Sequence, residues 1–427
     1  MVRKDWSIGI DCFLMIICAY FYLCFNDCQP LYKRIIGVAI VFVSCVLVYK
    51  SRKDRFKLIT FCVILYVNIT IAFSDCFTNG QRSLPYYTLV WQVYRNSIYE
   101  ITFLKALFLF LCVVNLFMKK EETNTVHIDT FTSQDNPICF MVAYLIMTYG
   151  LVTGYLGMGG NVSSYVSGTT TLYEYCTLFF LIALYYSGKD KIRMILLYVY
   201  SIAYIMQAIL YGDRSSAFPM VLLLVLLLFK KLTLKDVGIF SILGIFCSNA
   251  ISIYRQNYSL NDFIYNYINR YSLDSIMSDT VSQSYYTGIS LVAVKESMGN
   301  TFKYGIDYIG GIIFGGGYGN SNITTLGKQY ALNKGGGLII SDFYFIGGVI
   351  GVIVLGIILS IFIRFLDRNI CSMDYIWKCY FTIMVFRWYL YRSFDLFRGV
   401  LFVFPVVFLA FKIIDEICTS MRKNSFL

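Results

Sequence analysis

The sequence predicts an all-α, polytopic membrane protein with about twelve transmembrane helices and one long extracytoplasmic loop that carries interfacial helices. Of its 427 residues, 58% are hydrophobic and only 14% are charged, whereas soluble domains carry about 25% charged residues. Apolar runs near the roughly 20 residues that cross a bilayer follow one another along the chain. Lys and Arg concentrate in alternate connections, as the positive-inside rule requires of a multi-pass protein.

Twelve apolar runs are predicted to cross the membrane: 6–25, 33–49, 58–77, 98–118, 137–157, 170–187, 194–211, 215–229, 237–254, 338–363, 379–394 and 399–414. The segment 84–94 can lie at the interface or cross, and the pattern leaves both open. The first run is too long for a signal-peptide core and lacks an Ala-x-Ala site, so it is expected to remain as a crossing. The whole chain, 1–427, is predicted to be one integral membrane domain.

The distribution of positive charge predicts the orientation. Basic residues cluster in 50–57, 119–120, 189–193, 230–235, 364–378 and the C-terminal tail. Cytoplasmic connections carry such an excess, so both termini are predicted to be cytoplasmic. The turn 211–216 and the long segment 255–337 then share the outer face, which is where we expect the functional site.

The long extracytoplasmic loop, 255–337, has its own pattern. Apolar residues recur at helical spacing in 260–271, which predicts an amphipathic helix lying on the membrane surface. A hydroxyl-rich stretch, 278–290, follows, and then an apolar run, 304–314. That run can dip into the bilayer only where protein or water satisfies its backbone. Glycine clusters at 315–319 and 335–337 are interpreted as flexible hinges.

Arg214 is the first candidate for a binding residue. It stands in the turn Gly212-Asp213-Arg214-Ser215-Ser216, where Asp213 or Ser215 can cap the helix that follows. Such a helix start favours a phosphate, and a guanidinium adds a fork of donors that grips a pyrophosphate bidentately. The alternative interpretation is an interfacial arginine that reaches towards lipid headgroups.

Other arginines are predicted on the same face. Arg255 and Arg270 stand where the chain leaves the membrane, so they can surround one anionic headgroup with Arg214, or serve as a helix-end residue and a solvated helix face. Arg387, Arg392 and Arg398 belong to the last apolar hairpin. Arg387 falls within a span and should face a partner or a wet cavity. Arg392 and Arg398 either line the cavity or anchor the helices.

Four acids are predicted on the outer face as candidates for a general base: Asp279, Glu296, Asp307 and Asp342. A base beside an arginine-bound phosphate would deprotonate an incoming hydroxyl. Asp342 opens a predicted span, where an acid is costly unless it is paired or functional. Four further intramembrane charges, Asp11, Glu100, Lys105 and Glu174, are interpreted as structural pairs.

Several classes of function are disfavoured. The net charge of +11 is explained by the connections between spans, and no nucleic-acid motif is present. The 14 cysteines include no CxxC pair and fall mostly in apolar runs, where free Cys is a small buried hydrophobe. His127 is the only histidine and is predicted to be cytoplasmic, so no metal site is expected on the outer face. The glycine clusters match no nucleotide-binding fingerprint.

From Arg214 onwards the chain resembles the bacterial oligosaccharide repeat-unit polymerases, the Wzy-type family that builds O-antigen and capsular polysaccharide. The resemblance lies in an arginine turn before a short span and an arginine-bearing outer loop. It continues in Ser341-Asp342-Phe343-Tyr344-Phe345-Ile346-Gly347, similar to the family's small-acidic-x-aromatic-x-x-Gly sequence, and in the arginine-containing final hairpin. It covers roughly the C-terminal half. The family typically has Glu where Asp342 stands.

The resemblance implies a GT-C-like membrane glycosyltransferase in the bacterial plasma membrane. Its donor and acceptor would both be undecaprenyl-diphosphate-linked glycans, and it would need no cofactor or metal. By analogy, Arg214 with Arg255 or Arg270, joined by Arg398, would hold the diphosphate, and Asp342 or Glu296 would activate the acceptor hydroxyl. A chain-length regulator and a flippase would be neighbours. The related ligases use an outer-face histidine, which this chain lacks.

The main rival is a lipid-linked oligosaccharide flippase or another transporter, which also has about twelve spans. Such transporters typically show related halves and short loops, with charges along a central path, and no repeat is visible here. A third interpretation is an acyltransferase or a structural membrane component. An acyltransferase would require a catalytic histidine on the outer face.

Overall fold

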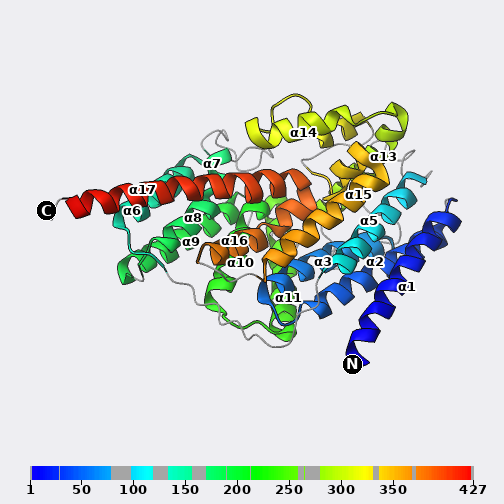
Figure 1. Cartoon of the computed structure of the whole chain (residues 1–427), viewed down its shortest axis with the longest axis horizontal. Coiled ribbons are helices and arrows are strands. Elements are labelled where there is room, and N and C mark those ends of the chain that lie inside the picture. Colours follow the sequence, from blue (N-terminus) through cyan, green and yellow to red (C-terminus); the bar gives the residue numbers. More distant parts are fainter. Residues whose placement is uncertain are drawn as a thin grey trace.

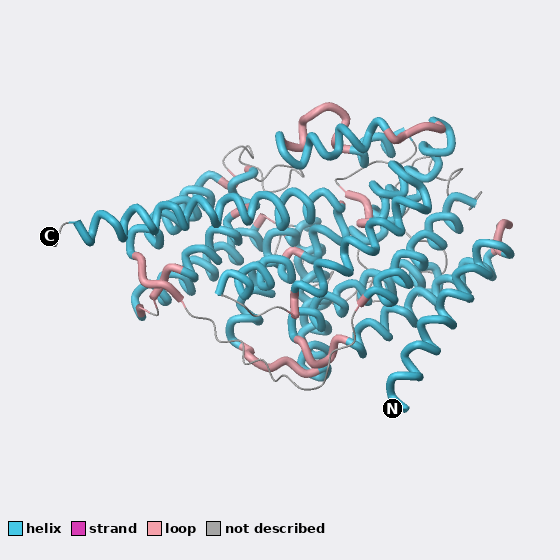
Figure 2. The backbone as a smooth tube through the Cα atoms, in the orientation of Figure 1, coloured by secondary structure: helices cyan, strands magenta, loops and turns pink. Residues whose placement is uncertain are grey.

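The structure, a computed structural model, describes residues 2–27, 29–77, 98–118, 133–155, 170–188, 190–211, 213–257, 264, 279–329, 336–367 and 372–424. These residues are almost entirely helical (Figures 1 and 2). The first half contains α1 (Val2–Cys24), α2 (Pro30–Lys50), α3 (Arg55–Phe77), α5 (Ile98–Phe117), α6 (Pro137–Thr153), α7 (Thr171–Glu174), α8 (Cys176–Tyr185) and α9 (Lys191–Leu210). The second half contains α10 (Arg214–Leu228), α11 (Leu234–Asn257), α13 (Asp279–Met298), α14 (Lys303–Phe314), the 3-10 helix η2 (Ile323–Gln329), α15 (Ile340–Phe365), α16 (Ser372–Ile383), the π-helices η3 (Phe386–Tyr391) and η4 (Asp395–Val403), and α17 (Phe404–Asn424).

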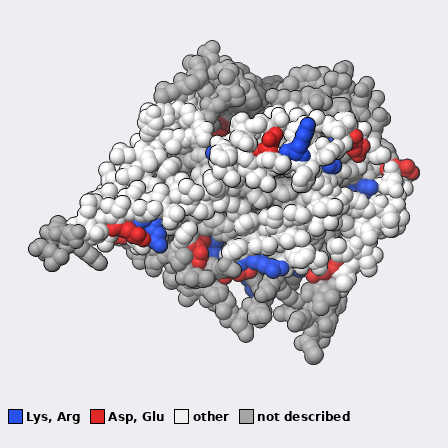
Figure 3. All heavy atoms as spheres, turned by 45° about the horizontal axis from the view of Figure 1, so that its top comes forward, with Lys and Arg blue, Asp and Glu red and all other residues white. Residues whose placement is uncertain are grey.

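The all-α membrane architecture agrees with the sequence prediction. Six helical segments of the described part are long and apolar enough to span a bilayer, and α6, α8, α10 and part of α1 are shorter apolar helices. Large apolar side chains face outwards, among them Leu23 at 76% and Ile350 at 73% exposure. In Figure 3 the visible charged side chains gather in two bands, with a broad uncharged surface between them. Such a belt is what a hydrocarbon layer requires of the surface that it contacts.

Several connections that are predicted to be cytoplasmic contact one another. In one group, Lys57 pairs with Asp367, and Arg55 donates to the carbonyl of Phe229. In a second group of connections, which are also predicted to be cytoplasmic, Arg193 pairs with Asp135 at 2.7 Å. These contacts agree with the prediction that these connections share one side of the membrane.

A regular bundle is formed by α2, α3 and α5. Lys33 of α2 pairs with Glu100 of α5 at 2.7 Å between Nζ and Oε1, and Tyr285 of α13 donates to the same carboxylate oxygen at 2.7 Å. Lys50 pairs with Asp11. Charged groups in this bundle are thus held by partners, as expected for structural pairs inside a membrane protein.

Residues 279–290 of the hydroxyl-rich stretch form the first part of α13, which packs against α3, α5, α15 and η2. Thr287 and Ser290 donate to carbonyls one turn earlier in the same helix, so their hydroxyls need no water. At Gly288 an added Cβ would lie 2.4 Å from the Phe103 ring, so glycine allows α13 to approach α5 closely. The segment 255–337 therefore contributes a core helix as well as surface elements.

Three predicted spans are irregular. The run 170–187 breaks at Tyr175, which separates α7 from α8. In α15, Gly348 has φ +59° and ψ −139°, a conformation that glycine adopts without steric cost. The last hairpin is π-helical in η3 and η4. π-helical turns are rare and frequently occur at functional sites.

Helix α14 lies on one face of the molecule, outside the main bundle (Figure 1), where it contacts η4 and α15. Tyr304 and Tyr308 face inwards, and Phe302, Ile306 and Ile309 are exposed. This helix corresponds to the predicted apolar run 304–314. The segment 84–94 and the predicted amphipathic helix 260–271, apart from Ile264, lie outside the described residues.

Candidate functional site

Arg214 is the first residue of α10, in a turn fixed by Asp213. The Asp213 carboxylate accepts hydrogen bonds from the Ser216 amide at 3.2 Å, from the hydroxyls of Ser215 and Ser216 at 2.6 Å each, and from Tyr155 at 3.3 Å. Asp213 therefore acts as the helix cap that the sequence suggested. Arg214 extends beyond this turn.

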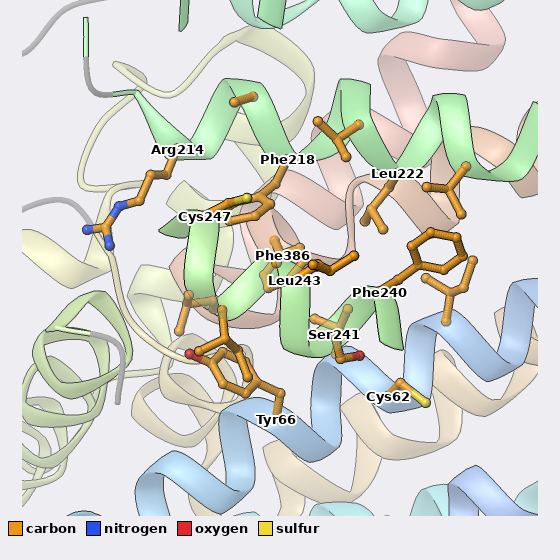
Figure 4. A pocket seen from close by; sticks show the side chains of 18 of the residues that line it. Cys62, Tyr66, Arg214, Phe218, Leu222, Phe240, Ser241, Leu243, Cys247 and Phe386 are labelled. Atoms are coloured by element: carbon orange, nitrogen blue, oxygen red, sulfur yellow. The ribbon is translucent and has the colours of Figure 1, made fainter. Parts of the chain in front are cut away.

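An apolar cavity of about 450 Å³ lies beside Arg214. Its walls come mainly from α3, α10 and α11, with residues of α13 and η3, and include Val63, Phe218, Leu222 and Phe240. Figure 4 shows Arg214 at one end of this row of apolar side chains, on α10. The volume falls in the range of about 300–1,000 Å³ that is usual for ligand pockets.

Polar groups gather at the Arg214 end of the cavity. Arg214 donates from Nη2 to the Thr280 hydroxyl at 3.3 Å, and Thr280 and Ser215 also line the cavity. Thr280 stands in the first turn of α13. The arrangement suits an elongated apolar ligand with an anionic head, because the hydrocarbon would contact the walls and the head would lie beside the guanidinium.

Arg387 connects this turn to the last hairpin. It is 8% exposed and donates from Nε to the Ser215 carbonyl at 3.2 Å and from Nη2 to the Ser216 hydroxyl at 3.1 Å. Its Nη1 lies 3.1 Å from a carboxylate oxygen of Glu174. The prediction that Arg387 faces a partner inside its span agrees with these contacts. Arg387 positions the Arg214 turn.

Asp342, in the first turn of α15, contacts the last hairpin. Its carboxylate accepts from the Ser393 hydroxyl at 2.6 Å, and Ser393 is also 2.7 Å from the Tyr308 hydroxyl. The residue is only 2% exposed. Arg392 pairs with Asp395 at 3.4 Å. A carboxylate enclosed in this way holds α15, α14 and the hairpin together.

Arg398 contacts the end of α14. Its Nη1 donates to the carbonyls of Gly311 at 3.1 Å and Ile312 at 2.8 Å, in the last turn of α14. Of the two interpretations open from the sequence, a lining residue or an anchor, these contacts favour the anchor.

Among the remaining sequence candidates, Asp307 accepts from the Asn320 amide at 3.1 Å, and the side chain of Asp279, next to Thr280, lies outside the described part of the chain. Glu296 belongs to the last turn of α13, about 24 Å along the helix from Thr280 at 1.5 Å per residue, and its side chain is exposed. Arg270 and the side chain of Arg255 lie outside the described part of the chain. Their proposed contact with a diphosphate stays a prediction.

Glu174 is a site residue that the sequence reasoning assigned to a structural pair. It is paired, but with Arg387 at the Arg214 turn, and its side chain is 45% exposed. Its position in an apolar run of ordinary length gave no sign that the helix stops there. A weak signal was available in Thr170, whose hydroxyl accepts from the Tyr173 amide as the cap of α7.

The described residues contain no group of three or more His, Cys, Asp or Glu side chains that could hold a metal ion. The site therefore consists of the Arg214 turn, the apolar cavity, and the pair Arg387 and Glu174 behind the turn. Comparison of the chain with protein-family models, curated proteins and solved structures finds no match.

Proposed function

We propose that this protein is a membrane glycosyltransferase that polymerises undecaprenyl-diphosphate-linked oligosaccharide repeat units into O-antigen or capsular polysaccharide. The reaction would take place on the outer face of the bacterial plasma membrane. One observation carries the proposal: an apolar cavity of about 450 Å³ has an arginine, Arg214, at its polar end. The resemblance to the repeat-unit polymerases described above supports the same assignment.

The chemistry of the donor matches the cavity in both of its parts. An undecaprenyl chain is a long hydrocarbon, so burying its first units against Phe218 and Leu222 is favourable by about 25 cal/mol per Å². The diphosphate head would lie against the Arg214 guanidinium and the start of α10, where fork-shaped donors and the helix dipole both favour negative charge. In glycosyl transfer the diphosphate is the leaving group, so the same contacts stabilise the charge that develops on it.

A flippase for the same lipid-linked glycan is the alternative. The break between α7 and α8 and the buried charge of Arg387 support it, because transporters place charged groups at discontinuous helices. Both functions need a lipid-diphosphate site, so binding alone does not separate them.

The deciding experiment uses the purified full-length protein in liposomes. The substrate is the lipid-linked oligosaccharide extracted from host cells that lack this protein. We expect the wild type to form a ladder of polymers on a gel. Movement of the lipid-linked glycan across the liposome membrane without a ladder would overturn the polymerase and support the flippase.

Arg214→Ala tests the diphosphate site by direct binding of undecaprenyl diphosphate, measured by native mass spectrometry or fluorescence quenching. A hydrogen bond to a charged group contributes about 1.5–3 kcal/mol, so Kd should rise about 10- to 100-fold. Arg52→Ala is the matched control, because Arg52 lies over the Tyr49 ring, away from the cavity. An unchanged Kd in Arg214→Ala would remove Arg214 from the site.

Val221→Trp tests the apolar part of the cavity, which Val221 lines. The larger side chain should fill space that the lipid needs and weaken undecaprenyl diphosphate binding, with inorganic pyrophosphate binding unchanged. Phosphatidylglycerol serves as the competitor. If it binds as tightly as undecaprenyl diphosphate, the cavity is an ordinary lipid site and the donor assignment fails.

A further inference from the structure

Glu174 is held at a break in the membrane-spanning region. It is the last residue of α7, and Tyr175, with φ −88° and ψ 0°, separates that short helix from α8. The Glu174 side chain is 45% exposed, although the run around it was predicted to cross the membrane. A half-exposed carboxylate at such a position can meet a ligand that approaches from outside the bundle.

The position of this carboxylate is fixed relative to the Arg214 turn. Arg387 reaches Glu174 with one nitrogen, Nη1, and Ser215 and Ser216 with Nε and Nη2. A planar guanidinium that uses three nitrogens for such contacts has little freedom to rotate. Glu174 and the start of α10 therefore belong to one rigid arrangement.

The other described carboxylates around this arrangement have structural roles. Asp213 caps α10 and accepts from three hydroxyls. Asp342 is buried and accepts from Ser393. Asp395 pairs with Arg392 and its side chain is 24% exposed, about half the value for Glu174. Of these acids, Glu174 is the one best placed to touch a substrate.

We propose that Glu174 is the general base of the glycosyl transfer and that Arg387 is its positioning residue. The inference rests on the proposed polymerase function. Glu174 takes the proton of the acceptor sugar's hydroxyl as that oxygen forms a bond to the anomeric carbon of the donor. The bond from this carbon to the diphosphate oxygen breaks, and its electron pair stays on the undecaprenyl diphosphate held by Arg214. No oxidant or reductant takes part.

The test measures polymer formation by the full-length protein in liposomes with the lipid-linked oligosaccharide substrate described above. Glu174→Gln keeps an oxygen for Arg387 but cannot accept the proton. We expect kcat to fall about 10²- to 10⁴-fold, the usual contribution of a general base. KM, the melting temperature and undecaprenyl diphosphate binding should stay near wild type. Glu416→Gln is the matched control, an exposed acid on α17.

Azide separates a catalytic role from a structural one, because it attacks without losing a proton. In Glu174→Ala, added azide should form a nitrogen bond to the anomeric carbon and release undecaprenyl diphosphate. The glycosyl azide, detected by mass spectrometry, should form at least about tenfold faster than in the wild type. A merely structural defect would not respond to azide.

The outcomes are distinct. If the wild type forms no polymer, the proposed function fails. If the wild type forms polymer and Glu174→Gln retains its kcat, the polymerase stands and Glu174 is not the base. Azide rescue in Asp342→Ala but not in Glu174→Ala would transfer the role to Asp342. If Glu174→Ala does not fold, the kcat of Glu174→Gln decides.

Discussion

The bundle of α2, α3 and α5 and the final hairpin around η3 and η4 bury charges in different ways. In the bundle, Glu100 is 1% exposed and is enclosed by regular helices that supply Lys33 and Tyr285 as partners. In the hairpin region, Arg387 is also buried, but its partner Glu174 is half exposed and stands at a helix break. The first arrangement stabilises the fold. The second keeps charged groups at a surface that a ligand can reach.

Removing the bundle charge should have the largest effect on stability. Glu100→Ala leaves Lys33 and the Tyr285 hydroxyl without this carboxylate, and breaking a buried ion pair costs about 3–5 kcal/mol. The melting temperature in detergent should fall clearly. Glu100→Gln, which keeps an acceptor for Tyr285, should lose less. Polymer formation per folded molecule should stay near wild type, and a selective loss of activity would contradict the comparison.

Arg387→Met should show the opposite behaviour. Removing one partner of an ion pair is costly when the other charge is buried, but Glu174 is 45% exposed and water can solvate it, so the loss of stability should be smaller than at Glu100. The Arg214 turn loses the contacts to Ser215 and Ser216. A misplacement of about 1 Å can lower a rate about 100-fold. We therefore expect polymer formation to fall by about two orders of magnitude with a small change in melting temperature. A variant that melts early and keeps its rate would assign Arg387 to the fold alone.

The smallest effect is expected at the bend in α15. Gly348→Ala would place a side chain at φ +59° and ψ −139°, a strained conformation that costs about 1–3 kcal/mol. Gly347→Ala is the matched control, since an added Cβ there meets nothing within 4 Å. Thermal unfolding of the two variants measures the difference. Equal melting temperatures would show that α15 straightens without cost.

Much of the architecture could be predicted from the sequence because long apolar runs and the placement of Lys and Arg reflect the bilayer directly. The same reasoning found Arg214, since a helix start with an arginine is visible in a few neighbouring residues. It placed Arg387 facing a partner because a charge inside a span needs one. These predictions depend on local composition or on the free-energy cost of an unpaired charge inside a membrane.

Other features depend on contacts between distant segments. The break at Tyr175 lies within a run of ordinary hydropathy, so Glu174 could not be recognised as the partner of Arg387. Asp342 was predicted to activate the acceptor hydroxyl and Arg398 to hold the diphosphate, but their partners, Ser393 and the end of α14, come from elsewhere in the chain. The sequence identified the charged residues of this region. Which of these side chains anchor helices and which are exposed could be seen only from the contacts in the folded structure.

Helix α13 has a consequence for how the protein is made. Its hydroxyl-rich sequence is too polar to enter a bilayer readily by its own hydrophobicity, yet residues such as Val281 and Ile289 are buried among neighbouring helices. Two of those neighbours, α3 and α5, are synthesised earlier, and α15 follows about forty residues later. The burial of α13 is therefore complete only after the ribosome has synthesised α15. In this region the order of assembly in the membrane differs from the order of translation.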